Sequence, residues 1–158
     1  MKRPAVIAVG LAAWLVGMPL AHGLAPWLVA TAGPRFGGSW NWLGLAPLAL
    51  GVLGLGWVAR TGFANLAKLP AETSLDWRPK VFLAEGPYAR TRNPMYVGEL
   101  ALWLGWAIWL GSPLVLLGAA LLFVGMQRVI RREERDLATQ FGDAYARYAA
   151  AVPRWILR

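Results

Sequence analysis

Two short polar segments of the chain carry side chains suited to binding a small charged molecule. The first, Asn93-Pro94-Met95-Tyr96, stands where an apolar run begins. A proline favours the first turn of a helix and Asn93 can cap it, so the N–H groups there would attract a carboxylate or ribose oxygens. The second, Glu133-Glu134, follows an apolar run and offers carboxylates to an amino group. We expect both segments to face one ligand.

Tyr88 and Tyr96 add aromatic faces close to these segments. Such faces stack on adenine or attract a sulfonium by cation–π interaction, although tyrosine is also common at membrane interfaces for purely physical reasons. A ligand that combines adenosine, a sulfonium, an ammonium group and a carboxylate would use all of these groups. The simpler alternatives are helix capping by Asn93 and surface ion pairs between the two glutamates and neighbouring arginines.

Glu99 is a further ionisable residue, one turn beyond Tyr96 inside an apolar run. A carboxylate at such a position is costly and needs a partner, and Arg128 lies at a similar depth on the next apolar run. The two residues predict either a structural ion pair or a contact with the reactive head of a substrate.

The elements that position these residues are four apolar spans, expected over residues 5–29, 42–63, 94–110 and 113–130. The chain has 158 residues, of which 58% are hydrophobic, and a mean hydropathy of +0.45, which excludes an ordinary soluble domain. No span alternates as a strand does, so the sequence predicts an all-α membrane protein with four transmembrane helices. A hairpin around Gly111-Ser112 would bring Tyr96 and Glu133 to the same membrane surface.

Two parts of the chain are expected. Residues 1–63 hold the first two spans, and residues 64–158 hold a polar loop, the hairpin and a cytoplasmic amphipathic helix after it. That helix lies on the lipid head groups, covers the site, or does both. Its apolar face, at three- and four-residue spacing, is expected to consist of Leu137, Phe141, Tyr145 and Tyr148.

The distribution of basic residues predicts the orientation. Lysines and arginines gather before the first span, between the second and third, and after the fourth, whereas Arg35 alone lies in the first loop. By the positive-inside rule, both termini and the central loop are cytoplasmic. This topology and anionic lipids explain the net charge of +8 without nucleic-acid binding. A cleaved signal peptide ending near Ala25 is the alternative, but it would conflict with the charge pattern.

Metal and disulfide chemistry find no support in the composition. The chain has no cysteine and a single histidine, which excludes disulfides, thiolate metal sites and histidine clusters. We interpret that histidine, His22, as a packing or hydrogen-bonding residue on the outer side, away from the candidate site.

Taken together, these motifs resemble the isoprenylcysteine carboxyl methyltransferase and phospholipid methyltransferase superfamily of membrane enzymes. The first two spans match only as apolar helices. The matching elements are Gly86-Pro87-Tyr88, Arg92 to Gly98, Glu133-Glu134, Leu137, Phe141-Gly142, Tyr145, Tyr148 and Val152-Pro153-Arg154. The resemblance implies S-adenosylmethionine as the methyl donor. It also implies a lipophilic or lipidated acceptor, such as an isoprenylcysteine-like carboxylate or a lipid amine. An amine acceptor must lose a proton when it is methylated, and Glu99 or Glu134 is the nearest candidate base.

By motif position, the resemblance implies ten cofactor-binding residues, and these are Lys80, Val81, Phe82, Leu83, Tyr88, Asn93, Pro94, Met95, Tyr96 and Glu133. Many members of the superfamily carry a histidine where this chain has Asn93. An asparagine keeps a hydrogen-bonding side chain but does not titrate near neutral pH, so a proton-handling role there is in doubt.

The sequence therefore predicts a multi-pass methyltransferase of a bacterial inner membrane, with its active site facing the cytoplasm. Three alternatives stay open. A reductase of related fold would bind a nicotinamide cofactor. A small four-helix transporter would use Glu99, but it leaves the long central loop and the cytoplasmic tail unexplained. A non-catalytic scaffold would make the polar motifs incidental.

Overall fold

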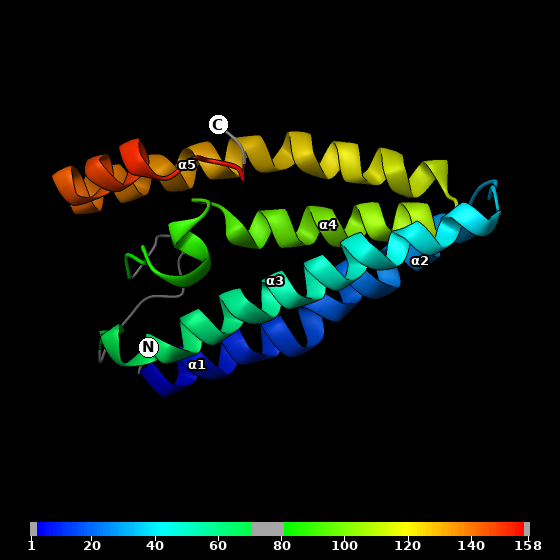
Figure 1. Ribbon diagram of the computed structural model, residues 1–158. Coiled ribbons are helices and arrows are strands. Elements are labelled where there is room, and N and C mark those ends of the chain that lie inside the picture. The colour runs from blue at the N-terminus through cyan, green and yellow to red at the C-terminus, as the bar shows by residue number, and fades with distance from the viewer. Residues whose placement is uncertain (1–2, 71–80, 157–158) are drawn as a thin grey trace.

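The computed structural model describes residues 3–70 and 81–156, which are almost entirely helical (Figure 1). The longer helices are α1 (Arg3–Ala12), α2 (Ala25–Thr31), α3 (Leu45–Ala64), α4 (Pro94–Trp109) and α5 (Pro113–Ala151). The short turns are η1 (Ala13–Gly17) and η2 (Leu20–Leu24), which are π-helical, and the 3-10 turns η3 (Ser39–Gly44), η4 (Leu66–Lys68) and η5 (Gly86–Ala89). No strand occurs in the described ranges, which confirms the predicted all-α class.

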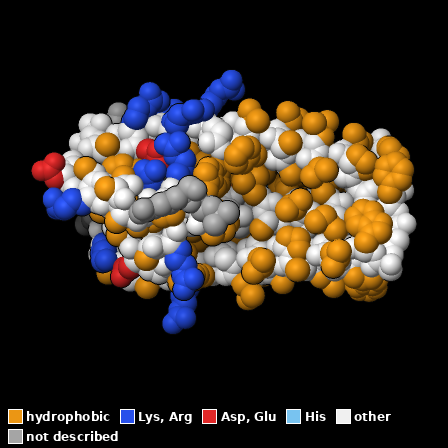
Figure 2. Space-filling view, turned by 45° about the horizontal axis from the view of Figure 1, so that its top comes forward, with side chains coloured by type: hydrophobic (Ala, Val, Ile, Leu, Met, Phe, Trp, Pro, Cys, Tyr) orange, Lys and Arg blue, Asp and Glu red, His pale blue; other side chains and the backbone are white. Residues whose placement is uncertain are grey.

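Three helical stretches of the described chain are long and apolar enough to cross a membrane, and they are Pro4–Thr31, Ser39–Ala64 and Pro113–Ala151. They contain three of the four predicted spans. The remaining one, α4, has only 16 residues, so a count of four spans stays a prediction. Large apolar side chains are widely exposed, and Leu15 and Leu53 are 72% and 71% accessible. Figure 2 shows such side chains over most of the molecule and lysines and arginines gathered toward one end, as expected for an integral membrane protein.

Helix α4 lies between α3 and α5 (Figure 1), and glycines bring it close to α3. A Cβ atom on Gly51 of α3 would lie 2.9 Å from the carbonyl oxygen of Gly98 of α4. Further along, a Cβ atom on Gly105 would lie 3.0 Å from the carbonyl oxygen of Gly44. In lipid, where apolar burial does little to drive helices together, such small residues allow the close backbone contact that stabilises the pair.

The hairpin between α4 and α5 turns at Gly111-Ser112, as predicted. Gly111 has a φ of 58°, and a Cβ atom there would lie 1.7 Å from the carbonyl oxygen of Phe36, so only glycine fits. The Phe36 N–H donates to the Gly111 carbonyl at 2.8 Å, and Asn41 Nδ2 donates to the Trp109 carbonyl at 3.0 Å. Ser112 caps α5 with its side chain. The loop after the first span therefore fixes the hairpin turn.

Helix α5 continues for 39 residues, well beyond its apolar part, which agrees with the predicted helical extension, whereas its cytoplasmic location stays a prediction. Its backbone leaves the helical region at Gly142, where φ is 50° and ψ is −126°, a break that the apolar spacing did not predict. The chain then turns back (Figure 1), and the Arg92 N–H donates to the Pro153 carbonyl at 2.9 Å. The last described residues consequently lie beside the start of α4.

The glycine contact predicts an asymmetric response to substitution within α3. Gly51→Leu forces atoms into the α4 backbone and is expected to lower the free energy of unfolding by about 1–3 kcal/mol. Gly54→Leu is the matched control, because a Cβ atom there meets nothing within 4 Å. Thermal unfolding in detergent measures both variants, and equal losses of stability would contradict the proposed packing.

Candidate functional site

The two segments singled out in the sequence meet through one hydrogen bond. The Tyr96 hydroxyl donates to Glu133 Oε1 at 3.0 Å and so joins α4 to α5 across 37 residues of sequence. Tyr96 is only 9% exposed and packs with Met126 and Ile130 of α5. The prediction that Tyr96 and Glu133 share one surface is confirmed. That they bind a cofactor stays a prediction.

Glu134, the second acidic residue, is held by two arginines. Arg154 donates from Nε to Oε1 at 3.1 Å and from Nη2 to Oε2 at 2.5 Å, and Arg92 Nη1 lies 3.2 Å from Oε1. The hydrogen bond to Glu134 raises the pKa of Arg154 above its usual value. A carboxylate engaged by two guanidinium groups is not available to accept a proton. In this structure Glu134 fastens the C-terminal segment, and its predicted role as a base stays a prediction.

Asn93 and Thr91 also hold the returning chain. Asn93 is 6% exposed, and its Nδ2 donates to the Arg154 carbonyl at 3.0 Å. The Thr91 hydroxyl donates to the same carbonyl at 2.9 Å. Pro94 opens α4 as predicted, but no side chain caps the helix. The expectation that Asn93 is the helix cap was therefore wrong, because its amide is turned toward the C-terminal segment.

Glu99 is buried at 9% exposure, but its neighbour is His22 instead of the expected Arg128. His22 belongs to the π-helical turn η2, and its Nε2 lies 3.9 Å from Glu99 Oε1. Trp103 Nε1 donates to His22 Nδ1 at 3.1 Å, which in a neutral imidazole leaves the ring proton on Nε2, facing Glu99. Arg128 is exposed, because the rotation of α5 directs it away from α4. His22 forms hydrogen bonds as expected, but it is not remote from Glu99.

A cavity of about 400 Å³ lies between α1, α3 and the segment that leads into α4. Four residues of the predicted cofactor set line it, and these are Val81, Leu83, Tyr88 and Met95. Most of the other lining residues are apolar side chains of α1 and α3. Burial, followed by the negative charge of Glu133, raises the pKa of Tyr88, so the phenol stays protonated at neutral pH. The volume falls within the range of about 300–1,000 Å³ that is usual for small-molecule sites.

Phe82, another member of the predicted set, is covered by the end of α5. Its ring centroid lies 5.4, 6.1 and 5.2 Å from those of Phe141, Tyr145 and Tyr148, respectively. The Tyr148 hydroxyl donates to the Tyr88 carbonyl at 2.8 Å. Three of the four residues predicted to form one apolar face, Phe141, Tyr145 and Tyr148, therefore pack on the segment before α4. They do not share one helical face, because the backbone leaves the helix at Gly142 between the first and the other two. Lys80 lies outside the described residues, so its predicted contact stays a prediction.

The Nε atom of Arg92 is buried and has no hydrogen-bond partner within the described chain. The Tyr145 hydroxyl is also buried, but the Arg92 side chain lies beside it and interacts with it. Because buried polar atoms are nearly always paired, Arg92 Nε is a candidate contact for a polar ligand. Among residues 3–70 and 81–156, no group of three or more histidine, cysteine or acidic side chains is arranged to hold a metal ion.

The residues missed at the sequence level are His22 as the neighbour of Glu99, and Arg92 and Arg154 as the partners of Glu134. A single ionisable residue in the otherwise apolar first span was a usable signal for His22, because such a group needs a polar neighbour in lipid. The Arg154 contact had no comparable signal, since it depends on the change of chain direction at Gly142.

Comparison with known proteins adds independent information. Residues 73–144 match a family described as phospholipid methyltransferase. An uncharacterised protein of Haemophilus influenzae is 43% identical over 63 residues, which are 39% of this chain and the whole of that relative. No solved structure matches the chain. The stretch matched by the family contains all ten residues of the predicted cofactor set, but not the first two spans or Arg154.

The Glu134 contacts predict a loss of stability confined to the C-terminal cover. Glu134→Ala removes an acceptor of charge-assisted hydrogen bonds and is expected to cost about 1.5–3 kcal/mol. Glu85→Ala is the control, because the Glu85–Lys68 pair is exposed at 62% and 58% of its side chains and contributes at most about 1 kcal/mol. Hydrogen exchange should accelerate over residues 143–156 in the first variant alone. Unchanged exchange there would contradict the role of the Glu134 contacts in holding the C-terminal segment.

Proposed function

This chain belongs to the phospholipid methyltransferase family, and from that premise we propose that it transfers a methyl group from S-adenosylmethionine to a lipophilic acceptor. The observation that carries the proposal is the hydrogen bond between Tyr96 and Glu133. This bond joins the start of α4 to α5 next to a cavity lined by Tyr88 and Met95. Both of these lining residues belong to the same predicted cofactor-binding set as Tyr96 and Glu133.

The residues present fit this cofactor. The apolar cavity wall formed by Val81, Leu83 and Met95 suits the adenine ring. Glu133 keeps one carboxylate oxygen that Tyr96 does not engage, and this oxygen suits an ammonium or ribose hydroxyl group. The unpaired Nε of Arg92 suits a carboxylate. When bound, S-adenosylmethionine supplies a methyl group on an electrophilic sulfonium, which tyrosine faces stabilise by cation–π attraction.

The contribution of the protein to this reaction is mainly alignment. Transfer needs a nucleophile about 3–3.5 Å from the methyl carbon and in line with the breaking bond. The Tyr96–Glu133 hydrogen bond fixes two side chains across the helix pair. The packing of Tyr148 on Phe82 covers the segment before α4 and limits the access of water, which favours methyl transfer over hydrolysis.

The chemistry of the acceptor decides whether a base is required. A carboxylate acceptor needs none, whereas an amine must release a proton. We propose Glu99 as the acceptor of that proton, with His22 beside it. Glu134 is committed to arginines and Arg128 is exposed, so neither takes part in the proposed mechanism.

We further propose that α4 crosses the membrane as the third of four spans and that both termini face the cytoplasm. The positive-inside pattern of the sequence supports this orientation. The acceptor's acyl or prenyl tail would enter from the bilayer, because α1 and α3 supply the apolar wall of the cavity. The cofactor would enter from the cytoplasm. No observation favours the transporter, the reductase or the scaffold over this function.

Calorimetric titration of the detergent-purified protein with S-adenosylmethionine tests the site. Glu133→Gln is expected to weaken binding by about 10- to 100-fold, because a hydrogen bond to a charged group is lost. Tyr96→Phe is expected to weaken it by about fivefold, and Glu85→Gln, at an exposed glutamate, should bind as the wild type does. No binding by the folded wild type refutes the function, whereas unaltered affinity in both site variants refutes only the residue assignment.

Methyl transfer from labelled cofactor to lipid extracts tests the proposed base. With an amine acceptor, Glu99→Gln is expected to lower kcat by about 100-fold or more, with the affinity for the cofactor unchanged. Arg128→Gln is the control and should keep full activity. An amine-methylating enzyme that tolerates Glu99→Gln, or loses equal activity in Arg128→Gln, would contradict the assignment.

A further inference from the structure

One face of α5 changes from apolar to basic along a single stripe. Leu117, Leu121 and Val124 are 55%, 64% and 57% exposed. The same alternating spacing of three and four residues continues to Arg128, Arg131 and Arg135, which are also exposed. Positions with this spacing lie above one another on a helix. The stripe therefore carries an apolar half inside the expected span and a basic half that begins with Arg128 at the end of that span and continues beyond it.

The basic half of the stripe is concave. Arg128, Arg131 and Arg135 line a hollow of about 550 Å³ together with Arg154 of the C-terminal segment. Within the described residues these first three arginines form no ion pair. Arg131 donates its Nε to the Gln127 carbonyl at 3.0 Å, and its other N–H groups have no acceptor among residues 3–70 and 81–156.

The Glu134 carboxylate, which also lines this hollow, does not cancel the positive charge of the three arginines. Glu134 is one of the lining residues, but it is already engaged by Arg154 and Arg92. The three unpaired guanidinium groups therefore leave the hollow positively charged. Guanidinium groups bind phosphate oxygens through paired N–H donors, and they do so better than a lysine ammonium.

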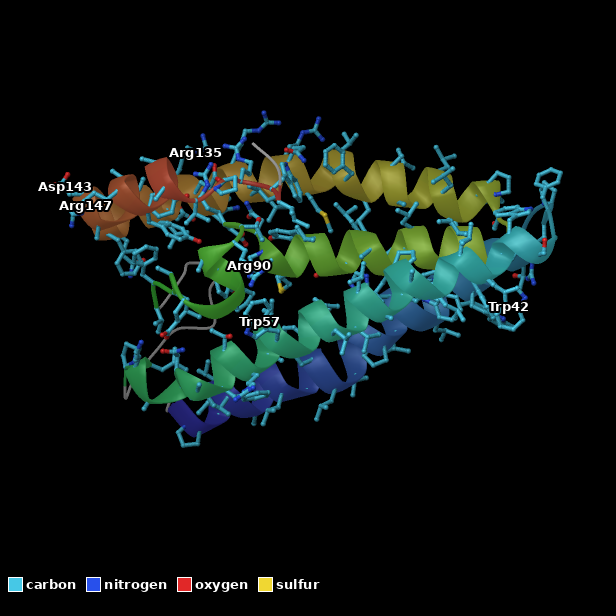
Figure 3. All side chains as sticks on the ribbon, viewed as in Figure 1. Trp42, Trp57, Arg90, Arg135, Asp143 and Arg147 are labelled. Carbon is cyan, nitrogen blue, oxygen red and sulfur yellow. The ribbon has the colours of Figure 1, made fainter. Side chains whose placement is uncertain are left out.

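We propose that this stripe of α5 binds an anionic phospholipid of the surrounding membrane. Its phosphate lies in the arginine hollow, and one acyl chain runs along Leu117, Leu121 and Val124. Continuity with the apolar half favours a lipid over a free phosphate, which would use the hollow alone. Arg135 projects from the side of α5 that faces away from α4 (Figure 3). The lipid site is therefore distinct from the Tyr96–Glu133 contact and does not depend on the proposed methyl transfer.

Lipid titration of the full-length protein in a neutral detergent tests this proposal. Short-chain phosphatidylglycerol is expected to raise the temperature of unfolding and to bind, whereas phosphatidylcholine of the same chain length does so much less. Arg131→Gln/Arg135→Gln is expected to bind phosphatidylglycerol about thirtyfold more weakly, since each arginine near an anionic surface contributes about fivefold. Arg132→Gln/Arg147→Gln removes the same charge from exposed positions outside the hollow and should bind as the wild type does.

Three outcomes would overturn the proposal. Equal losses in the two double variants would indicate a diffuse attraction to positive charge without a site. Equal binding of phosphatidylglycerol and phosphatidylcholine would remove the requirement for an anionic head group. Binding of glycerol phosphate as tight as that of the lipid would assign the hollow to a free anion and leave the apolar half of the stripe without a role.

Discussion

The rotation of α5 relative to α4 is the constraint on which the site depends. Successive residues of a helix differ by about 100° in direction, so a slip of one residue in the hairpin would turn Glu133 away from Tyr96. The turn at Gly111 prevents such a slip, because its backbone conformation and its contact with Phe36 leave no room for a side chain. The same rotation directs the arginine stripe of α5 outward. One turn therefore sets both the candidate active site and the basic hollow.

Polar contacts then divide between the two environments of the chain. At the basic end of the molecule, Glu134 joins Arg92 and Arg154 and holds the chain that returns from Gly142. Within the apolar helices, Glu99 has His22 as its neighbour, and Trp103 fixes the orientation of that imidazole. Ionisable groups in lipid require such partners. The contacts of Glu134 order the C-terminal segment that covers the candidate site. The contact with His22 keeps the Glu99 carboxylate next to that site.

The sequence predicted the features that follow from local pattern. Apolar run lengths gave the helices, Gly111-Ser112 gave the hairpin turn, and the hairpin in turn predicted that Tyr96 and Glu133 meet. Glu99 and Arg128 lie at a similar depth in two neighbouring spans, and this suggested Arg128 as the partner of Glu99. The depth of a residue in a span does not determine the direction in which its side chain projects. The contacts of Arg92 and Arg154 with Glu134 could not be predicted either. The position of Arg154 depends on the reversal of the chain at Gly142, and the apolar spacing does not indicate that reversal.

In the proposed function, one small molecule bridges the segment before α4 and the part of α5 around Glu133. Hydrogen exchange of the intact protein, measured with and without S-adenosylhomocysteine as a non-reactive analogue, shows whether both segments contact it. We expect simultaneous protection of residues 81–96 and 130–148, with residues 45–56 of α3 unchanged. Protection of only one of the two segments, or of neither at saturating analogue, would contradict it.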